Sequence, residues 1–444
     1  MKKRASLHNL GCKVNAYEMD VMEELLEAAG YEIVPFDEAA DVVIINTCSV
    51  TNIADRKSRQ MLHKARKRNP VAVIAAVGCY VQTGGRDRDA DLYIGNNRKG
   101  EIVSILSDYL KLGSTPKDSV IDVNAPCPYE DMQLGHISEH TRAYIKIQDG
   151  CNQFCSYCII PYARGRVRSR ERSEILKEAG RLARNGCREF VLTGIHISSY
   201  GYDLRHPDKK PMANCFEEEE LLELLRELDR LDGVERIRLS SLEPRIITAD
   251  FVKGLTELKS FCPHFHLSLQ SGSDSVLKRM NRQYDTEDYA GRVKLLREYF
   301  TDPAITTDII VGFPGETEEE FAQTLAFAER IAFYEMHIFR YSARKGTPAA
   351  SMKGQLTEAQ KAARSDRLEE LGARMTKAFI RKWKGKECEV LCEEEKEIDG
   401  MRYMTGHTRE YLKIAIPESS ARPGEVRRVR VGDEMKDGFV HGIE

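Results

Sequence analysis

The sequence predicts an α/β protein in three parts: an N-terminal domain with a parallel sheet, a central partial (β/α)6 barrel and a small C-terminal β-barrel. Three observations support this prediction. Strand and helix signals alternate up to about residue 115, the same alternation returns between residue 142 and about 350, and alternating β-type patterning takes over from residue 387. Strands that alternate with helices indicate a parallel sheet, whereas short strands without helices are typical of small barrels.

The three parts are predicted at residues 1–115, 141–375 and 376–444, with a linker at 116–140. The linker has no regular periodicity and contains Pro116, Pro126 and Pro128, which interrupt helices and strands. A chain of 444 residues is too long for one ordinary domain, so this division agrees with its length.

In the N-terminal part, apolar and amphipathic stretches follow one another. Strands are predicted at 3–10, 42–46 and 71–77, and helices at 18–29 and 54–68. Each strand is followed by a tight turn, and these turns carry Cys12, Cys48 and Cys79. Because the carboxyl ends of parallel strands meet at one edge of a sheet, the three thiols are expected to converge there.

In the central part, six further β/α units indicate an open relative of the (β/α) barrel. Strands are predicted at 143–148, 189–193, 236–240, 264–269, 305–311 and 335–341. Such barrels carry their chemistry at the C-terminal ends of the strands. A long surface helix is predicted at 355–384, before the C-terminal barrel.

The composition argues against export and against a global attraction to nucleic acid. The formal net charge is -3, so an RNA partner would have to be held by local basic patches. The N-terminus has no apolar signal segment, and the longest apolar run, near 71–81, is too short to span a bilayer. We therefore expect a cytoplasmic protein without a membrane partner, whose 12 cysteines stay reduced and serve metal binding or catalysis.

The strongest chemical signal is a cysteine trio with the spacing C-x3-C-x2-C directly after a predicted strand. It consists of Cys151, Cys155 and Cys158. Thiolates are the ligands of iron–sulfur clusters, and three of them leave one iron of a [4Fe–4S] cluster open to a small molecule. The alternative is a zinc site, but zinc commonly takes four ligands in two C-x2-C pairs, and no second pair lies nearby.

The second trio is Cys12, Cys48 and Cys79. It is predicted to form a metal site from the topology of the sheet rather than from the spacing of the cysteines. Convergence of the three turns would again create a three-thiolate cluster site with an open iron. Three independent buried cysteines remain an equal alternative from topology alone.

Both trios and their surroundings resemble the radical S-adenosylmethionine (SAM) methylthiotransferase family. The resemblance rests on Leu-Gly-Cys12-Lys-Val-Asn15, Asn-Thr-Cys48-Ser-Val-Thr51, the stretch from Cys151 to Arg170, Ser-Leu-Gln270-Ser-Gly272 and Asp308 to Thr317. It covers nearly the whole chain and implies a radical SAM barrel in the centre and a TRAM-like barrel at the C-terminus.

Among the branches of this family, the first two motifs are most similar to the one that acts on threonylcarbamoyl-adenosine at tRNA position 37. Another branch modifies isopentenyl-adenosine of tRNA, and a third modifies an aspartate of a ribosomal protein. The resemblance thus implies radical insertion of sulfur and methylation at carbon 2 of the adenine in the anticodon loop. It also implies two [4Fe–4S] clusters, SAM, an electron donor and a sulfur donor. A non-catalytic, metal-stabilised RNA-binding protein is the alternative of another class.

The resemblance further implies contacts to SAM. Tyr157 is expected near the adenine, and Thr193 and Gly194 stand where the superfamily has a Gly-Gly-Glu motif that meets the methionyl amine, a form from which this sequence departs. The remaining expected contacts are the strand-end residues Glu243, Gln270 and Gly312. Each could instead be an ordinary strand-end polar residue or turn glycine.

Local basic density suggests where RNA would bind. The expected contacts are Arg56, Lys57 and Arg59 on the helix after Cys48, Arg166, Arg168 and Arg170 after the second cysteine trio, and Arg428 in the C-terminal barrel with the aromatic residues Tyr403 and Tyr411. A solvated helix face is the plain alternative for the first group, and bonding to cofactor or protein carboxylates for some of the second. The other cysteines are expected to be plain thiols: Cys127, Cys187, Cys215, Cys262, Cys388 and Cys392.

Overall fold

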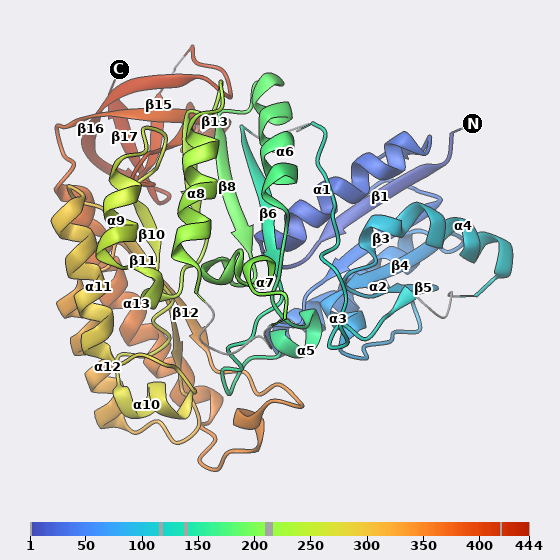
Figure 1. Cartoon of the computed structure of the whole chain (residues 1–444), viewed down its shortest axis with the longest axis horizontal. Coiled ribbons are helices and arrows are strands. Elements are labelled where there is room, and N and C mark those ends of the chain that lie inside the picture. Colours follow the sequence, from blue (N-terminus) through green and yellow to red (C-terminus); the bar gives the residue numbers. More distant parts are fainter. Residues whose placement is uncertain (1, 115–118, 137–140, 209–215, 418–419, 444) are drawn as a thin grey trace.

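The computed structural model describes residues 2–114, 119–136, 141–208, 216–417 and 420–443. Figure 1 shows an N-terminal sheet, a central arc of strands and a C-terminal barrel, in the order predicted from the sequence. The predicted α/β class is therefore confirmed. Parts of the predicted linker, at 116–118 and 137–140, lie outside the described residues, as does Cys215.

The N-terminal sheet has the strand order β2-β1-β3-β4-β5, and all its strands run parallel. Apolar side chains of α1 and α4 pack on one face and those of α2 on the other, which explains why β3 (Val42–Thr47) is buried throughout. The other strands are β1 (Arg4–Asn9), β2 (Glu32–Ile33), β4 (Val73–Gly78) and β5 (Leu92–Ile94). The helices are α1 (Lys13–Ala28), α2 (Asn52–Arg68), α3 (Cys79–Gln82), η1 (Lys99–Glu101) and α4 (Ile102–Leu112).

The central arc contains all six predicted strands. Together with the short antiparallel strand β7, which was not predicted, they form two sheets, β7-β6-β8-β9 and β10-β11-β12. The sheets are joined where the Leu242 N–H donates to the His266 carbonyl at 2.8 Å and the Ser268 N–H donates to the Leu242 carbonyl at 3.1 Å. The strands are β6 (Arg142–Asp149), β7 (Arg168–Ser169), β8 (Glu189–Gly194), β9 (Arg236–Leu239), β10 (His264–His266), β11 (Ala304–Val311) and β12 (Glu335–Arg340).

The longer helices of the central part cover the outer side of the arc, and short helices lie in the loops between the strands (Figure 1). They are α5 (Ile160–Arg164), α6 (Arg172–Arg184), η3 (Ile197–Ser199), α7 (Tyr202–Arg205), α8 (Glu218–Asp229), η4 (Pro244–Ile246), α9 (Ala249–Thr256), α10 (Asp274–Arg279), α11 (Thr286–Tyr299), α12 (Glu318–Ile331), η5 (Pro348–Ser351) and α13 (Glu358–Arg381). The domain boundary predicted between residues 375 and 376 falls within α13. None of the described helices is long and apolar enough to cross a lipid bilayer.

The C-terminal strands close into a barrel with the order β13-β14-β15-β17-β16. They are β13 (Glu387–Ile398), β14 (Met401–Thr408), β15 (Lys413–Pro417), β16 (Val426–Lys436) and β17 (Phe439–Ile443). The turn after β14 closes the N-terminal end of the central arc, where Tyr411 stacks on His264 with ring centroids 4.4 Å apart. Arg238 fixes the same turn by donating to the Thr408 carbonyl at 2.6 Å. The opposite end of the arc is left for the candidate site.

Candidate functional site

The first cysteine trio converges at the carboxyl edge of the N-terminal sheet. Cys12 is the N-cap of α1, Cys48 directly follows β3, and Cys79 opens α3 directly after β4. The strand register pairs the residues just before Cys48 and Cys79, so the two thiols start from adjacent positions. Burial raises the pKa of the Cys48 thiol to about 11, and the nearby thiols of Cys79 and Cys12 contribute to the rise. The sequence argument for convergence therefore agrees with the structure.

Asn15 holds the loops of this trio together. Its side-chain amide donates to the carbonyls of Leu10 at 3.0 Å and Thr47 at 3.1 Å, which lie in the loops around Cys12 and Cys48. Gly11 has a φ of 138°, and a Cβ there would lie 2.8 Å from the Asn15 amide nitrogen. The Leu-Gly-Cys-Lys-Val-Asn motif thus combines one thiol with the side chain that positions its loop.

The second trio lies in the loop between β6 and α5. Cys151 and Cys155 are buried and Cys158 is half-buried. Burial raises the pKa of the Cys151 thiol to about 12, and burial with the neighbouring Cys155 raises that of Cys158 further. Thiols in such surroundings ionise when a metal binds them, because the cation compensates their charge.

The donor sets fit iron–sulfur clusters because polar N–H groups already point at the sulfurs. The Arg282 guanidinium donates to Cys155 Sγ at 3.3 Å, and the Gln153 backbone N–H donates to Cys151 Sγ at 3.5 Å. In the first trio, the Asn96 amide donates to Cys79 Sγ at 3.4 Å. Hydrogen bonds to ligating sulfurs stabilise thiolate character and tune cluster potentials.

A buried ion network ties the two trios to each other. Glu18 of α1 accepts from Arg164 of α5 at 2.7 and 3.0 Å and from Lys146 of β6 at 2.8 Å, and it also pairs with Lys99. Burial alone would raise the pKa of Glu18, but Arg164, Lys146 and Lys99 outweigh it and hold that pKa well below its usual range. Arg164 also donates to Asn15 Oδ1 at 2.7 Å. The segment after Cys158 is thereby fixed to the side chain that positions Cys12.

A cavity of about 250 Å³ lies between the two trios. Val50 and Thr51, from the loop after Cys48, line one side, and the segment from Tyr157 to Ile160 lines another. The ends of the central strands complete the lining with Gln270, Asp308, Ile310, Phe339, Arg340, Tyr341 and Ser342. The chamber therefore contacts both cysteine loops at once.

Arg344 closes this chamber by fixing the loop after Cys48. Its guanidinium donates to Asn52 Oδ1 at 2.6 Å and to Asp55 Oδ2 at 2.7 Å. The Asn52 N–H in turn donates to Ser342 Oγ at 3.0 Å, from the segment after β12. Arg344 is 7% exposed, so its guanidinium is largely shielded from water, whereas Asn52 is exposed.

The residues predicted to contact SAM divide into two groups. Tyr157 and Gln270 line the chamber, and Gln270 has a φ of 73°. The structure also describes Thr193, Gly194 and Glu243, and none of these three lines the chamber. Glu243 pairs with Arg245 at 2.8 Å and caps η4.

The backbone conformation and the packing around Gly312 explain why a glycine stands at this position. Its φ is 72°, and a Cβ there would lie 2.4 Å from Lys361 Cγ. The glycine is thus required by the packing of α13 against the end of β11. Contact of Gly312 with an adenine stays a prediction.

The residues predicted to contact RNA also divide. Arg56, Lys57 and Arg59 are exposed on α2, and with Lys64, Lys67 and Arg68 they form what we call the basic α2 face. Arg166 is exposed and lies 4.6 Å over the Phe154 ring, next to the second trio. Arg428 is 81% exposed.

The burial of Arg168 and Arg170 differs from the predicted exposure to RNA. Both are buried: Arg168 donates to the Arg164 carbonyl at 2.9 Å, and Arg170 bonds to Asp131 at 2.9 Å and pairs with Glu178. Alternation in an extended segment was expected to place all these arginines on one open face. Instead the segment passes between the domains, and its guanidinium groups neutralise interior carboxylates. Tyr403 and Tyr411 likewise pack inside, Tyr403 in the C-terminal barrel and Tyr411 against His264.

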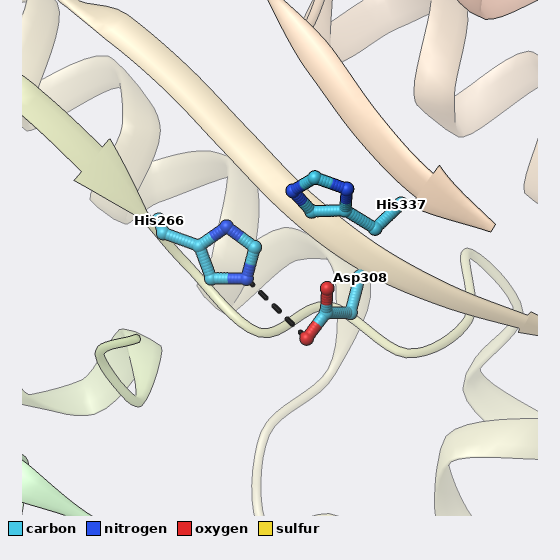
Figure 2. Close-up of side chains that lie close together, drawn as sticks. All are labelled: His266, Asp308 and His337. Atoms are coloured by element: carbon cyan, nitrogen blue, oxygen red, sulfur yellow. Dashed lines mark ion pairs between the residues drawn. The ribbon is translucent and has the colours of Figure 1, made fainter. Parts of the chain in front are cut away.

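Sequence reasoning missed four contributors: Arg164 as an interior cation, Arg282, Arg344 and a cluster formed by His266, Asp308 and His337. Figure 2 shows the cluster, in which His266 Nε2 lies 3.3 Å from Asp308 Oδ2. Asp308 stood in a quoted motif, but the two histidines come from strands far apart in sequence. Only their parallel register on β10, β11 and β12 brings them together. The assignment of the cysteines outside the two trios as plain thiols stays a prediction.

Comparison with known proteins agrees with this geometry. Residues 145–328 match the Radical SAM superfamily, and residues 4–93 match an uncharacterized protein family, UPF0004. A Bacillus subtilis protein named threonylcarbamoyladenosine tRNA methylthiotransferase MtaB is 39% identical over 98% of this chain and 94% of its own. A Moorella thermoacetica protein named tRNA-2-methylthio-N(6)-dimethylallyladenosine synthase is 36% identical over 97% and 96%.

Among solved structures, a radical S-adenosylmethionine methyltransferase, TsrM, from Kitasatospora setae is similar with a TM-score of 0.55. It is 15% identical, and the match covers 79% of this chain and 74% of that one. At this identity the likeness concerns the fold alone.

Proposed function

This chain belongs to the radical SAM tRNA methylthiotransferases, and from that premise we propose that it attaches a methylthio group to carbon 2 of threonylcarbamoyl-adenosine in the anticodon loop of tRNA. The observation that carries the proposal is the chamber between the two cysteine trios. A substrate base bound in it would face both cysteine loops at once. The substrate branch is supported by the name of the Bacillus subtilis relative.

Membership in the radical SAM superfamily implies SAM and a [4Fe–4S] cluster, for which Cys151, Cys155 and Cys158 are the expected ligands. We propose Cys12, Cys48 and Cys79 as ligands of a second such cluster, supported by their convergence and by the Asn96 hydrogen bond to Cys79. When bound, these cofactors supply the radical, the sulfur and the methyl group, while the protein supplies binding and orientation.

The residues around the chamber have separate tasks in this proposal. Arg282 donates to the Cys155 sulfur and so stabilises negative charge at that site. Arg164 and Glu18 hold the two thiol sites at a fixed separation, because both are buried and bonded across the domain interface. Arg344 keeps the Cys48 loop closed over the chamber and limits the entry of water.

For the RNA, we propose that the basic α2 face and Arg166 contact phosphates beside the chamber. Both are exposed, and both belong to segments that adjoin a cysteine loop. Phosphate contacts of this kind position RNA without reading its sequence. A reductant and a sulfur donor are further proposed partners, and the cytoplasmic location stays a prediction.

The proposal is tested by mass spectrometry of tRNA nucleosides from cells with and without the gene. We expect the methylthio form of threonylcarbamoyl-adenosine to vanish with the gene and to return with the wild-type gene but not with Cys48→Ala or Cys155→Ala. If the methylthio form of isopentenyl-adenosine vanishes instead, the second candidate is right. That candidate is favoured by the name of the Moorella thermoacetica relative.

A second experiment separates the enzyme from a non-catalytic RNA-binding protein. The anaerobically reconstituted chain should bind about eight irons in two clusters and cleave SAM under reduction. Cys48→Ala should keep SAM cleavage but lose sulfur insertion. A chain that carries clusters but never cleaves SAM would refute the enzyme assignment.

A further inference from the structure

The His266, Asp308 and His337 cluster continues the lining of the chamber along β10, β11 and β12, with His266 and Asp308 half-buried and His337 exposed. Asp308 pairs with His337 in the register of β11 and β12, and Ile310 pairs with Phe339 one step closer to the chamber. Side chains two apart in a strand share a face, so His337 points the same way as Phe339, which lines the chamber. Asp308 itself belongs to both the lining and the cluster. The cluster therefore forms the polar floor of the chamber.

The polar atoms of this floor are close to one another but only partly satisfied by the protein. One nitrogen or oxygen of each residue lies within 4.8 Å of those of the other two. His266 bonds to Thr306 Oγ1 at 3.0 Å and pairs with Asp308 at 3.3 Å. The His337 ring lies beside that of His266, with ring centroids 5.6 Å apart and the planes tilted by 35°, and no hydrogen bond joins it to the described residues. Its ring, seen beside Asp308 in Figure 2, is available to a ligand.

Burial lowers the pKa of His337, and the neighbouring His266 lowers it further, so the His337 ring is a neutral donor and acceptor near pH 7.

We propose that His266, Asp308 and His337 form the subsite that recognises the threonylcarbamoyl group of the substrate base. The inference rests on the proposed function and names how that substrate is chosen. The threonylcarbamoyl group carries a carboxylate, a hydroxyl and a urea linkage, whose donors and acceptors match imidazole groups and a carboxylate acceptor. An isopentenyl group offers none of these and would leave the floor unpaired, which costs binding energy.

His337 is the residue to change, because it makes no hydrogen bond to the residues that the structure describes. His337→Phe keeps a ring of similar shape and removes both nitrogens, whereas His337→Gln retains a donor and an acceptor. His136→Phe is the matched control, since His136 is 53% exposed and pairs with Glu24, a residue that does not line the chamber. Reconstituted enzymes would be given equal amounts of anticodon stem-loops that carry threonylcarbamoyl- or isopentenyl-adenosine.

Wild type and His136→Phe should strongly prefer the threonylcarbamoyl stem-loop. His337→Phe should lower kcat/KM for that stem-loop about 10- to 100-fold and reduce the preference over isopentenyl-adenosine by a similar factor, because a polar pocket loses its discrimination with its hydrogen-bonding group. His337→Gln should restore most of it. SAM cleavage without RNA is measured for each protein as its own reference, and the preference between the two stem-loops is compared after division by it.

Undiminished preference in His337→Phe would overturn the subsite. So would a stoichiometric divalent metal, detected by elemental analysis, that is present in wild type and absent in His337→Phe. If wild type itself prefers isopentenyl-adenosine, the proposed function fails, and this outcome is visible before any variant is compared.

Discussion

Replacing Arg164 with alanine should weaken both the fold and the first cysteine site. Its guanidinium is fully buried and donates hydrogen bonds to Glu18, Asp149 and Asn15. Removing the sole partner of a buried charge costs about 3–5 kcal/mol. Because Lys146 and Lys99 would still pair with Glu18, we expect a smaller loss of about 2–3 kcal/mol in the free energy of unfolding.

The measurement is urea unfolding followed by circular dichroism, with iron content after reconstitution as a second reading. Arg166→Ala is the matched control, since Arg166 lies two residues further on, is exposed and should change the unfolding free energy by less than about 0.5 kcal/mol. Arg164→Ala should also bind less iron, because Asn15 Oδ1 loses its partner beside Cys12. Equal unfolding free energies for the two variants would refute the reasoning that this network joins the domains.

Three further predictions concern other parts of the chain. Burial, with Glu23 and Glu24 nearby, raises the pKa of Asp20 to about 7 from 3.8. The folded protein therefore holds a proton that the unfolded chain releases, and its stability falls as the pH rises from about 4 to about 7. In urea unfolding, Asp20→Asn should raise the free energy of unfolding by about 2 kcal/mol at pH 8 and leave it unchanged at pH 4. An equal gain at both pH values would contradict this. Arg344→Ala should lower the iron bound after reconstitution from about eight per chain toward four, because the Cys48 loop loses the hydrogen bonds that fix it, while SAM cleavage persists. An unchanged iron content would show that the loop does not need these bonds. Reversing two charges of the basic α2 face, in Lys57→Glu/Arg59→Glu, should weaken binding of the anticodon stem-loop at least about tenfold and reduce its salt dependence in fluorescence anisotropy, and unchanged affinity would place the RNA elsewhere.

Much of the fold could be predicted because its signals are local. The apolar runs of β3 and β4 and the turns after them are visible in the sequence, and parallel strands necessarily bring such turns to one edge. The convergence of Cys12, Cys48 and Cys79 followed from that rule before any coordinates were considered. The start of α1 was placed too late, at residue 18 rather than Lys13, because the cap there is a cysteine and not one of the usual capping residues.

The arginines after Cys158 show where local reasoning ends. Their alternate spacing is correct for an extended segment, but spacing does not tell whether a face meets solvent or a second domain. Arg164 and Arg170 are buried because Glu18 and Glu178, which are distant in sequence, supply the compensating charge.

The sequence by itself determined the three-part α/β architecture, the two thiol trios and the family, because strand periodicity and cysteine motifs are properties of short segments. Only the tertiary structure decided which cations are interior, which loops enclose the chamber and that His266, Asp308 and His337 meet on its floor. The reason is physical: burial and side-chain contact depend on how separate segments pack, and the free energy of a charge or an imidazole is set by the neighbours that packing supplies.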